Sequence, residues 1–340
     1  MTSRRTCLAA LGAGAGLALL GRPAIVKAQT PIALRVSSSM PSDPNSAHFV
    51  WHERFVAALK ERVGDRIRLD YFPNGQLGKE ADVVQQVTIG SVDMMIVGSS
   101  IWATAVPEVG MLDLGYVFDD FEHAGRLMDG QVGDTLSKLL LDRKGVTVIG
   151  WGFHFGARSV YTKQKVENLA GLKGVKLRVL PSVAFVDSFK IMGAVPAPIP
   201  FNELYTALQS GVVDGFEHDA ASVVANRLFE VTKNLLETNH LFSPMGVFMG
   251  RRGLAKIPAD LKTAFLEAAA QATKQERGDA ASRGQAAIEH LKGLGVQVTP
   301  VSQADRRGVQ ARLREQLYAP FATKYPATKP LFEAVEAARV

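Results

Sequence analysis

The sequence predicts an α/β protein in which helices cover both faces of a largely parallel sheet. Short apolar or alternating segments that suit strands are separated by amphipathic segments that suit helices. The composition, 47% hydrophobic and 21% charged, is that of an ordinary globular protein. The length of 340 residues suits two domains or one large domain.

In the first half of the chain, strands and helices alternate with recognisable boundaries. Asn45 or Ser46 suits the N-cap of a helix that runs to about Val63. The turn Pro73-Asn74-Gly75 ends a strand before the next helix begins. The expected strands are residues 32–37, 66–72, 93–97 and 146–151, and the expected helices are 45–63, 80–89 and 121–144.

The second half continues the alternation and then changes character. Good helix formers dominate residues 258–294, and Pro258 suits a first helical turn. A continuous helix of about 35 residues would be roughly 50 Å long, which exceeds one lobe, so we expect it to lie across two. Before it we expect strands at 159–162, 174–179 and 212–216, helices at 183–192 and 203–211, and an extended proline-rich link at 194–200.

Residues 1–28 have the features of a cleaved signal peptide. Arg4 and Arg5 precede an apolar run at 8–20 that is too short to span a membrane comfortably, and Ala28 suits a cleavage site. The arginine pair resembles the twin-arginine export signal, although a general secretion route stays open. We therefore expect a periplasmic protein; the alternative is an uncleaved membrane anchor.

The charge of the chain changes when this leader is set aside. Without its four basic residues, the 39 Lys and Arg fall to 35 against 33 Asp and Glu, a net charge of +2. No basic tail remains, so we expect no nucleic acid partner. The only cysteine, Cys7, lies in the leader, which excludes an intramolecular disulfide.

No motif of a common enzyme class is present, and we expect neither an enzyme nor a cofactor. His48 and His52 have metal-ligand spacing on a helix, but the zinc-protease pattern needs a glutamate directly after the first histidine. Asp214, Glu217 and Asp219 suit either a hard cation or strand ends that face water. We expect no metal site, with Glu217 and Asp219 as a minor alternative.

Two arginines lie near the ends of predicted strands. Arg178 is close to the carboxyl end of strand 174–179, where ligands usually bind in α/β proteins, and Arg158 precedes strand 159–162. If both strands end at one edge, two guanidiniums meet there, and arginine holds a carboxylate through two parallel hydrogen bonds. The alternative is two unrelated surface arginines.

Three blocks resemble the solute-binding proteins of tripartite ATP-independent periplasmic (TRAP) transporters, of the C4-dicarboxylate-binding type. They are FPNGQLGKEADVVQQVTIGSVDM, NLAGLKGVKLRVLPS and FNELYTALQSGVVDGFEH. The similarity extends over nearly all of the chain after the leader. It implies a two-lobe, type II-like periplasmic binding protein fold, with mixed sheets flanked by helices and a long helix spanning both lobes.

The resemblance also implies a set of ligand-binding residues. Arg178 matches the family's principal carboxylate clamp, Arg158 its second arginine and Phe201 an aromatic residue that packs on the ligand. His218 stands where the family usually has asparagine; it could donate to a hydroxyl or carboxylate and charge below about pH 6.5, or be a structural histidine at the cleft rim. A rough alignment adds Ser38, Ser39, Trp102 and Trp151.

The resemblance finally implies a division into lobes and a function. We expect lobe I at 29–153 plus about 244–283, lobe II at 154–243 plus about 284–330, and a C-terminal tail at 331–340. The lobes would close around a small organic acid, which a monomeric protein would deliver to the membrane permease of a TRAP transporter. The alternatives are a ligand-sensing subunit for a membrane receptor and, less favoured, a periplasmic enzyme acting on a carboxylate.

Overall fold

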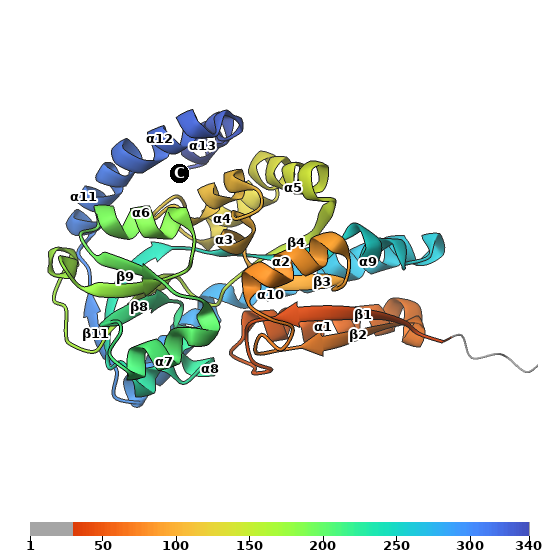
Figure 1. Ribbon diagram of the computed structural model, residues 1–340, viewed down its shortest axis with the longest axis horizontal. Helices are drawn as coiled ribbons and strands as arrows, with labels where there is room; N and C mark the ends of the chain where they lie inside the picture. The colour runs from red at the N-terminus through yellow and green to blue at the C-terminus, as the bar shows by residue number, and fades with distance from the viewer. Residues whose placement is uncertain (1–29, 340) are drawn as a thin grey trace, which may run out of the picture. The chain divides into compact units, whose positions relative to one another are not determined.

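The computed structural model describes residues 30–339 (Figure 1). The expected signal peptide, residues 1–28, lies outside this range. Among the described residues, no helix combines the length and the apolar character that a membrane span needs.

The first sheet has five strands in the order β2-β1-β3-β10-β4. β1 is parallel to both β2 and β3, whereas β10 is antiparallel to β3 and β4. The expectation of a largely parallel sheet therefore holds for the first three strands only, because β10 returns from the second sheet. The strands are β1 (Ile32–Ser38), β2 (Ile67–Phe72), β3 (Met94–Gly98), β4 (Val146–Phe153) and β10 (Pro244–Gly250).

The second sheet has six strands in the order β11-β9-β5-β8-β6-β7. β6 is parallel to β7 and β8, while β5 is antiparallel to β8 and β9. Two mixed sheets confirm the predicted fold class; we call the first sheet with its helices lobe I and the second lobe II. The strands are β5 (Arg158–Thr162), β6 (Lys176–Val179), β7 (Val195–Pro198), β8 (Gly215–His218), β9 (Asn234–Leu241) and β11 (Gln297–Pro300).

Each lobe contains a point where the connections between strands reverse direction. In lobe I, α1 (Ala47–Val63) leads from β1 to β2, and α2 (Glu80–Ile89) leads back past β1 to β3. In lobe II, α6 (Val183–Ile191) leads from β6 to β7, and α7 (Leu204–Gln209) leads back past β6 to β8 (Figure 1). Right-handed crossovers place the two helices of each pair on opposite faces, and a ligand crevice opens at the carboxyl ends of the strands between them.

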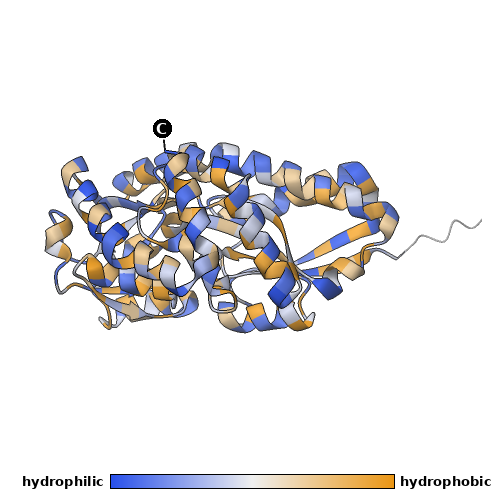
Figure 2. Ribbon diagram, turned by 90° about the horizontal axis from the view of Figure 1, so that it is seen from above, coloured by the Kyte–Doolittle hydropathy of each residue, from blue (hydrophilic) through white to orange (hydrophobic). Residues whose placement is uncertain are grey.

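The helix α10 (Ala259–Gly293) confirms the predicted long helix, and it contacts α1 in lobe I and α8 (Ala220–Ala225) in lobe II. Its Gly284 is needed for packing: a Cβ there would lie 2.3 Å from the Cα of Gly156, whose φ of +102° also favours glycine. Hydrophilic and hydrophobic residues alternate along most helices (Figure 2), as expected for helices that pack one face inward.

The expected helix at 121–144 is two helices, α4 (Phe121–Met128) and α5 (Gln131–Lys144). Gly130 interrupts them because its backbone is extended, with φ −124° and ψ −151°.

The expected link at 194–200 contains an edge strand, β7. The other helices are α3 (Ser99–Trp102), α8 (Ala220–Ala225), α9 (Arg251–Ala255), α11 (Gln303–Leu313), α12 (Ala319–Lys324) and α13 (Lys329–Ala337). Short 3-10 segments cover Gly64–Arg66, Pro107–Asp113, Leu169–Leu172, Phe201–Glu203, Leu228–Glu230 and Pro326–Thr328, and a π-helical turn, Arg314–Tyr318, joins α11 to α12.

The chain passes between the sheets at two neighbouring places. β4 ends at Phe153, which pairs with Pro244 at the start of β10, and the His154 N–H donates to the Ser243 carbonyl at 3.3 Å. Most of the expected tail is helix α13, whose Leu331 and Val335 are buried. The exact boundaries of the two lobes stay a prediction.

Candidate ligand-binding site

A small cavity lies between the lobes, at the strand edges where the reversals of direction predict a crevice. Its enclosed volume of about 20 Å³ is room for roughly one water molecule, so the lobes must separate or side chains must move before a larger ligand can enter. Its lining comes from both lobes and from the crossing segments: Met40, His48, Glu80, Gly98, Ile101, His154, Arg158, Leu180, Phe201, His218 and Ser243.

Arg178, in β6, lies just behind this lining and is fully buried. Its guanidinium carbon is 5.7 Å from the ring centre of Phe201, and its Nε donates to the Ile199 carbonyl at 2.8 Å. Both terminal nitrogens are enclosed and have no hydrogen-bond partner among residues 30–339. Burial lowers the pKa of Arg178 to about 10, so the side chain stays charged. A buried cation with two unsatisfied donors is costly, and an anion is the acceptor that such a group suits.

Arg158, at the start of β5, is also fully buried but is paired within the protein. Its Nε lies 2.6 Å and its Nη2 2.7 Å from the two carboxylate oxygens of Glu217. Burial alone would raise the pKa of Glu217, but the Arg158 guanidinium outweighs it and the pKa falls to about 2. Arg158 and Arg178 do lie at the same sheet edge, with β8 between their strands, and the charge of Arg158 contributes to the lowered pKa of Arg178.

His218 ends β8 and packs on Phe201, with the ring centres 5.4 Å apart. Its Nδ1 lies 2.8 Å from Oδ2 of Asp219, whose other oxygen caps α8 by accepting the Ser222 N–H at 2.9 Å. Burial and the nearby Arg158 lower the pKa of His218. The side chain therefore charges only at a pH lower than the expected 6.5.

Two more histidines line the cavity, and sequence reasoning did not assign them to it. The His48 ring is 5.4 Å from that of His154, which is 6.1 Å from that of His218, so three imidazoles run from lobe I to lobe II. Burial lowers the pKa of His48 and lowers that of His154 to about 3. His52, the suggested metal partner of His48, instead stacks on Tyr71 at 4.3 Å. The one signal for His154 was its position directly after the predicted crossing at Phe153.

Ser38 and Ser39 act on the cavity through other side chains. The Ser38 hydroxyl lies 2.9 Å from Nδ1 of His48. The Ser39 hydroxyl donates at 2.6 Å to Glu80, the first residue of α2 and a lining residue that the sequence analysis missed. Burial raises the pKa of Glu80.

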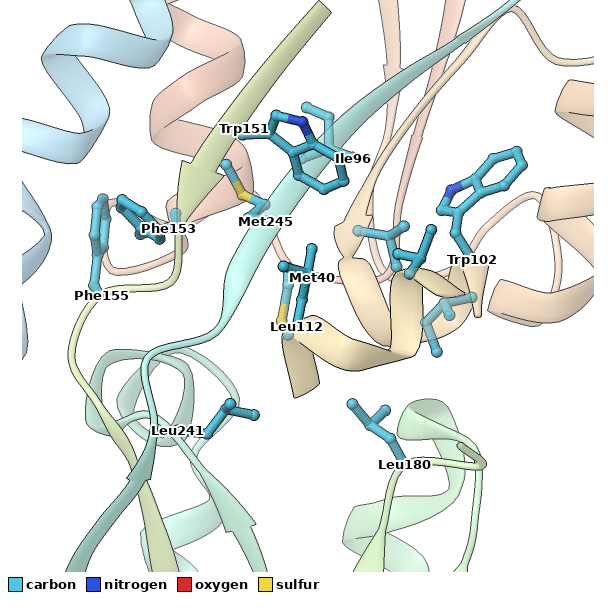
Figure 3. Close-up of a cluster of buried hydrophobic side chains, with 14 of the residues drawn as sticks. Met40, Ile96, Trp102, Leu112, Trp151, Phe153, Phe155, Leu180, Leu241 and Met245 are labelled. Carbon is cyan, nitrogen blue, oxygen red and sulfur yellow. The ribbon is translucent and has the colours of Figure 1, made fainter. Parts of the chain in front are cut away.

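Trp102 and Trp151 are not brought to the cavity. Both are buried in lobe I against Phe248, with ring-centre distances of 4.8 and 5.6 Å, and the Trp151 indole donates to Ser137 at 3.0 Å. Figure 3 shows both rings on the side of lobe I away from Leu180 of lobe II. We therefore leave the two tryptophans out of the proposed site.

The acidic residues considered for a metal do not converge. Glu217 is paired with Arg158, and Asp219 contacts His218 and the N-terminus of α8. Asp214 is exposed and accepts the Lys176 N–H at 3.0 Å. Within residues 30–339, no group of three His, Cys, Asp or Glu side chains is arranged to hold a metal ion.

A larger groove, of about 530 Å³, lies between α6, the Pro107–Asp113 segment and α12. Its lining is mostly apolar, and its charged members are Asp187, Lys190 and Lys324. Asp187 and Lys190 face each other at 3.7 Å on one helix. The smaller cavity is the better candidate despite its size, because the buried and unsatisfied charge of Arg178 lies beside it.

The fold and this cavity define a class: a two-lobe binding protein with a buried, cationic site between its lobes. The family model of bacterial extracellular solute-binding proteins, family 7 (DctP), matches residues 38–324, and the chain belongs to this family. This confirms the predicted class, a periplasmic solute-binding protein.

Similar proteins cover nearly the whole chain. The 2,3-diketo-L-gulonate-binding periplasmic protein YiaO of Escherichia coli is 32% identical over 87% of this chain and 89% of its own length. The C4-dicarboxylate-binding periplasmic protein DctP of Rhodobacter capsulatus is 27% identical, with 87% of each chain covered. A TRAP periplasmic solute-binding protein of Bradyrhizobium, solved with α/β-D-galacturonate, is 30% identical with a TM-score of 0.82, covering 90% of this chain and 99% of its own.

Proposed function

We propose that this protein binds a small organic acid between its lobes, with Arg178 holding the carboxylate, and delivers it to the membrane permease of a TRAP transporter. The observation that carries the proposal is the pair of enclosed Arg178 nitrogens without an acceptor among the described residues. A carboxylate would satisfy both through parallel hydrogen bonds. Phe201 would pack against the ligand beside the guanidinium.

Capture depends on contacts with both lobes. A ligand stabilises the closed arrangement only through interactions that the open arrangement lacks. His48 and Glu80 come from lobe I, while Phe201 and His218 come from lobe II, so a ligand among them would contact both. Lys79 and Glu203, 2.7 Å apart, join the two lobes directly and support the closed arrangement.

The relatives suggest which acids to test first. Diketogulonate and galacturonate, named for two relatives, are sugar acids, and we propose a sugar acid here too. The C4-dicarboxylate of the Rhodobacter relative is the other class to include. We further propose that the protein acts as a monomer and does not transform its ligand.

A thermal-shift screen of organic acids on the purified mature protein tests the proposal. At a ligand concentration one hundred times Kd, binding should stabilise the protein by about 2.7 kcal/mol. Mass spectrometry of small molecules released from freshly purified protein should identify an acid. If no acid shifts Tm and none is released, the proposed function is refuted.

A further inference from the structure

The charges and hydrogen-bonding groups of the cavity carry an inference about the ligand itself, which rests on the proposed function. We propose that the cavity selects a singly charged acid over the matching diacid, and that His48 of lobe I and His218 of lobe II recognise hydroxyl groups on the ligand tail.

The cations at and beside the cavity differ in whether they already have an acidic partner. Arg158 is already matched by Glu217 through two short contacts, and Lys79, next to Glu80 in the sequence, is paired with Glu203. Arg178 thus remains as the cation at the cavity whose terminal nitrogens lack an acceptor among residues 30–339. One ligand carboxylate matches this one guanidinium.

A second carboxylate on the ligand would enter a site that already holds three acidic side chains. Glu217 and Asp219 are kept charged by their partners, and the carboxyl group of Glu80 lines the cavity. The second carboxylate would also lose its hydration without gaining an unpaired cation, and a buried, unpaired charge is strongly disfavoured. A neutral tail avoids both costs.

His218 has two contacts at Nδ1: the Asp219 carboxylate, which can only accept, at 2.8 Å, and the Asp219 backbone N–H, which can only donate, at 3.0 Å. The carboxylate is closer and carries a full charge, so we assign the proton to Nδ1. The ring is neutral, so its Nε2 is an acceptor. A hydroxyl donates to such a nitrogen, whereas a carboxylate has no proton to offer and is repelled.

His48 lines the lobe I side of the cavity. Its Nδ1 contacts Ser38, and its Nε2 is enclosed with no hydrogen-bond partner among the described residues. A hydroxyl both donates and accepts, so it satisfies this nitrogen in either tautomer. A tail with hydroxyls at both ends of the imidazole row would therefore join lobe I to lobe II.

Matched acid pairs provide the test on the wild-type protein. We would measure Kd by titration calorimetry at pH 7.5 for erythronate against meso-tartrate, D-gluconate against D-glucarate, and D-galactonate against galactarate. Within a pair the carbon chain and the internal hydroxyls are the same, and a terminal CH₂OH replaces one carboxylate. We expect the monoacid of every pair that binds to be at least about tenfold tighter, because the diacid would bury a second charge without a partner.

The outcomes separate this inference from the proposed function. A diacid that binds as tightly as its monoacid, or more tightly, overturns the inference and leaves the proposed function intact. If none of the six acids binds, and the wider screen also finds no acid, both fail together.

A variant tests the role of the histidine. His218→Phe keeps an aromatic ring and removes the acceptor, so the preferred hydroxy acid should bind at least about tenfold more weakly, while the affinity for the unhydroxylated acid of equal chain length should change little. His290→Phe, at an exposed position of α10, is the matched control and should change neither. Equal losses for both acids in His218→Phe would contradict the assignment, and the acid pairs decide the matter if that variant does not fold.

Discussion

The first residue of β5 and a residue near the C-terminal end of β6 are both arginines, but their electrostatic environments differ. Arg158 and Arg178 are both fully buried at one edge of the lobe II sheet. Arg158 has its carboxylate inside the protein, in Glu217, whereas the terminal nitrogens of Arg178 have no acceptor among the described residues. Burial of an arginine therefore does not mark a binding site by itself; the missing partner does.

The difference separates two roles. Removing Arg158 would leave a buried carboxylate without its cation, so Arg158 should matter for stability. Removing Arg178 would relieve a buried, partly unsatisfied cation, so Arg178 should matter for ligand binding and little for folding.

The largest expected effect is on ligand binding in Arg178→Ala. Truncating one partner of a buried charge pair costs about 2–5 kcal/mol, so we expect acid binding to weaken by about a hundredfold or more. Arg178→Lys should also bind poorly, because an ammonium group cannot form two parallel hydrogen bonds. Titration calorimetry with the preferred acid measures both.

The control for this prediction is Arg227→Ala, which removes an exposed arginine paired with Glu230. It should bind like the wild type. All three variants should unfold at a temperature close to that of the ligand-free wild type. Near wild-type affinity in either Arg178 variant would remove this residue from its proposed role.

The second effect is on stability in Arg158→Met. The buried Glu217 would lose its cation, and breaking a buried pair in this way destabilises proteins by about 3–5 kcal/mol. Urea unfolding of the ligand-free protein measures the change. The double variant Arg158→Met/Glu217→Leu should recover much of the loss, because no unpaired charge remains. Equal stability of Arg158→Met and the wild type would show that the pair contributes little.

The third effect is a stability maximum near neutral pH. Burial lowers the pKa of His154 from 6.5 to about 3, so the unfolded chain binds a proton that the folded protein does not, and the free energy of unfolding falls as pH drops below 6.5. Asp113 and Glu276 have pKa values raised by burial to about 8, so the folded protein holds their protons more tightly than the unfolded chain does. The stability that these two protons give the folded protein is lost progressively as the pH rises toward 8. The pKa values of four further histidines are also lowered: His48, His52, His218 and His240.

Below pH 6.5 these five histidines outnumber the acids with raised pKa values, so acid should destabilise the protein. Each proton contributes a slope of about 1.4 kcal/mol per pH unit. Urea unfolding at pH 5, 6.5 and 8 should give its highest free energy of unfolding at the middle value. A curve that is flat or rises steadily with pH would contradict the assigned buried states.

The smallest effect is expected from Lys79→Ala. The Lys79–Glu203 pair connects the lobes but is exposed to solvent, where ion pairs contribute little. The affinity for the acid should fall a few-fold at most, and high salt should remove the difference from the wild type. A large loss that persists in high salt would mean that this pair, and not Arg178, controls closure.

Local signals in the sequence predicted much of the fold and several of the residues that lie at or beside the cavity. Helix α10 follows from its run of helix formers, and Arg178 from its place at the end of a strand. Strand alternation places Lys176 and Arg178 on the same face of β6, yet Lys176 is exposed and Arg178 is buried. The strand pattern shows the face of the sheet, but not that the carboxyl end of β6 is covered by the other lobe.

Other residues of the cavity depend on contacts that distant segments make. Glu217 lies 59 residues from Arg158 in the sequence, so its pairing was not readable. His48, His154 and Glu80 reach the cavity only because lobe I faces lobe II. Aromatic residues such as Trp102 suit a core and a cavity equally well, and here the core of lobe I holds them.

The central claim is that the partnerless guanidinium, not the paired one, holds the ligand. A crystal structure of the protein with its preferred acid tests it most directly. We predict both carboxylate oxygens within hydrogen-bonding distance of Nη1 and Nη2 of Arg178, with Arg158 still bound to Glu217. A carboxylate held by Arg158, with Glu217 displaced and Arg178 unaltered, would contradict the account.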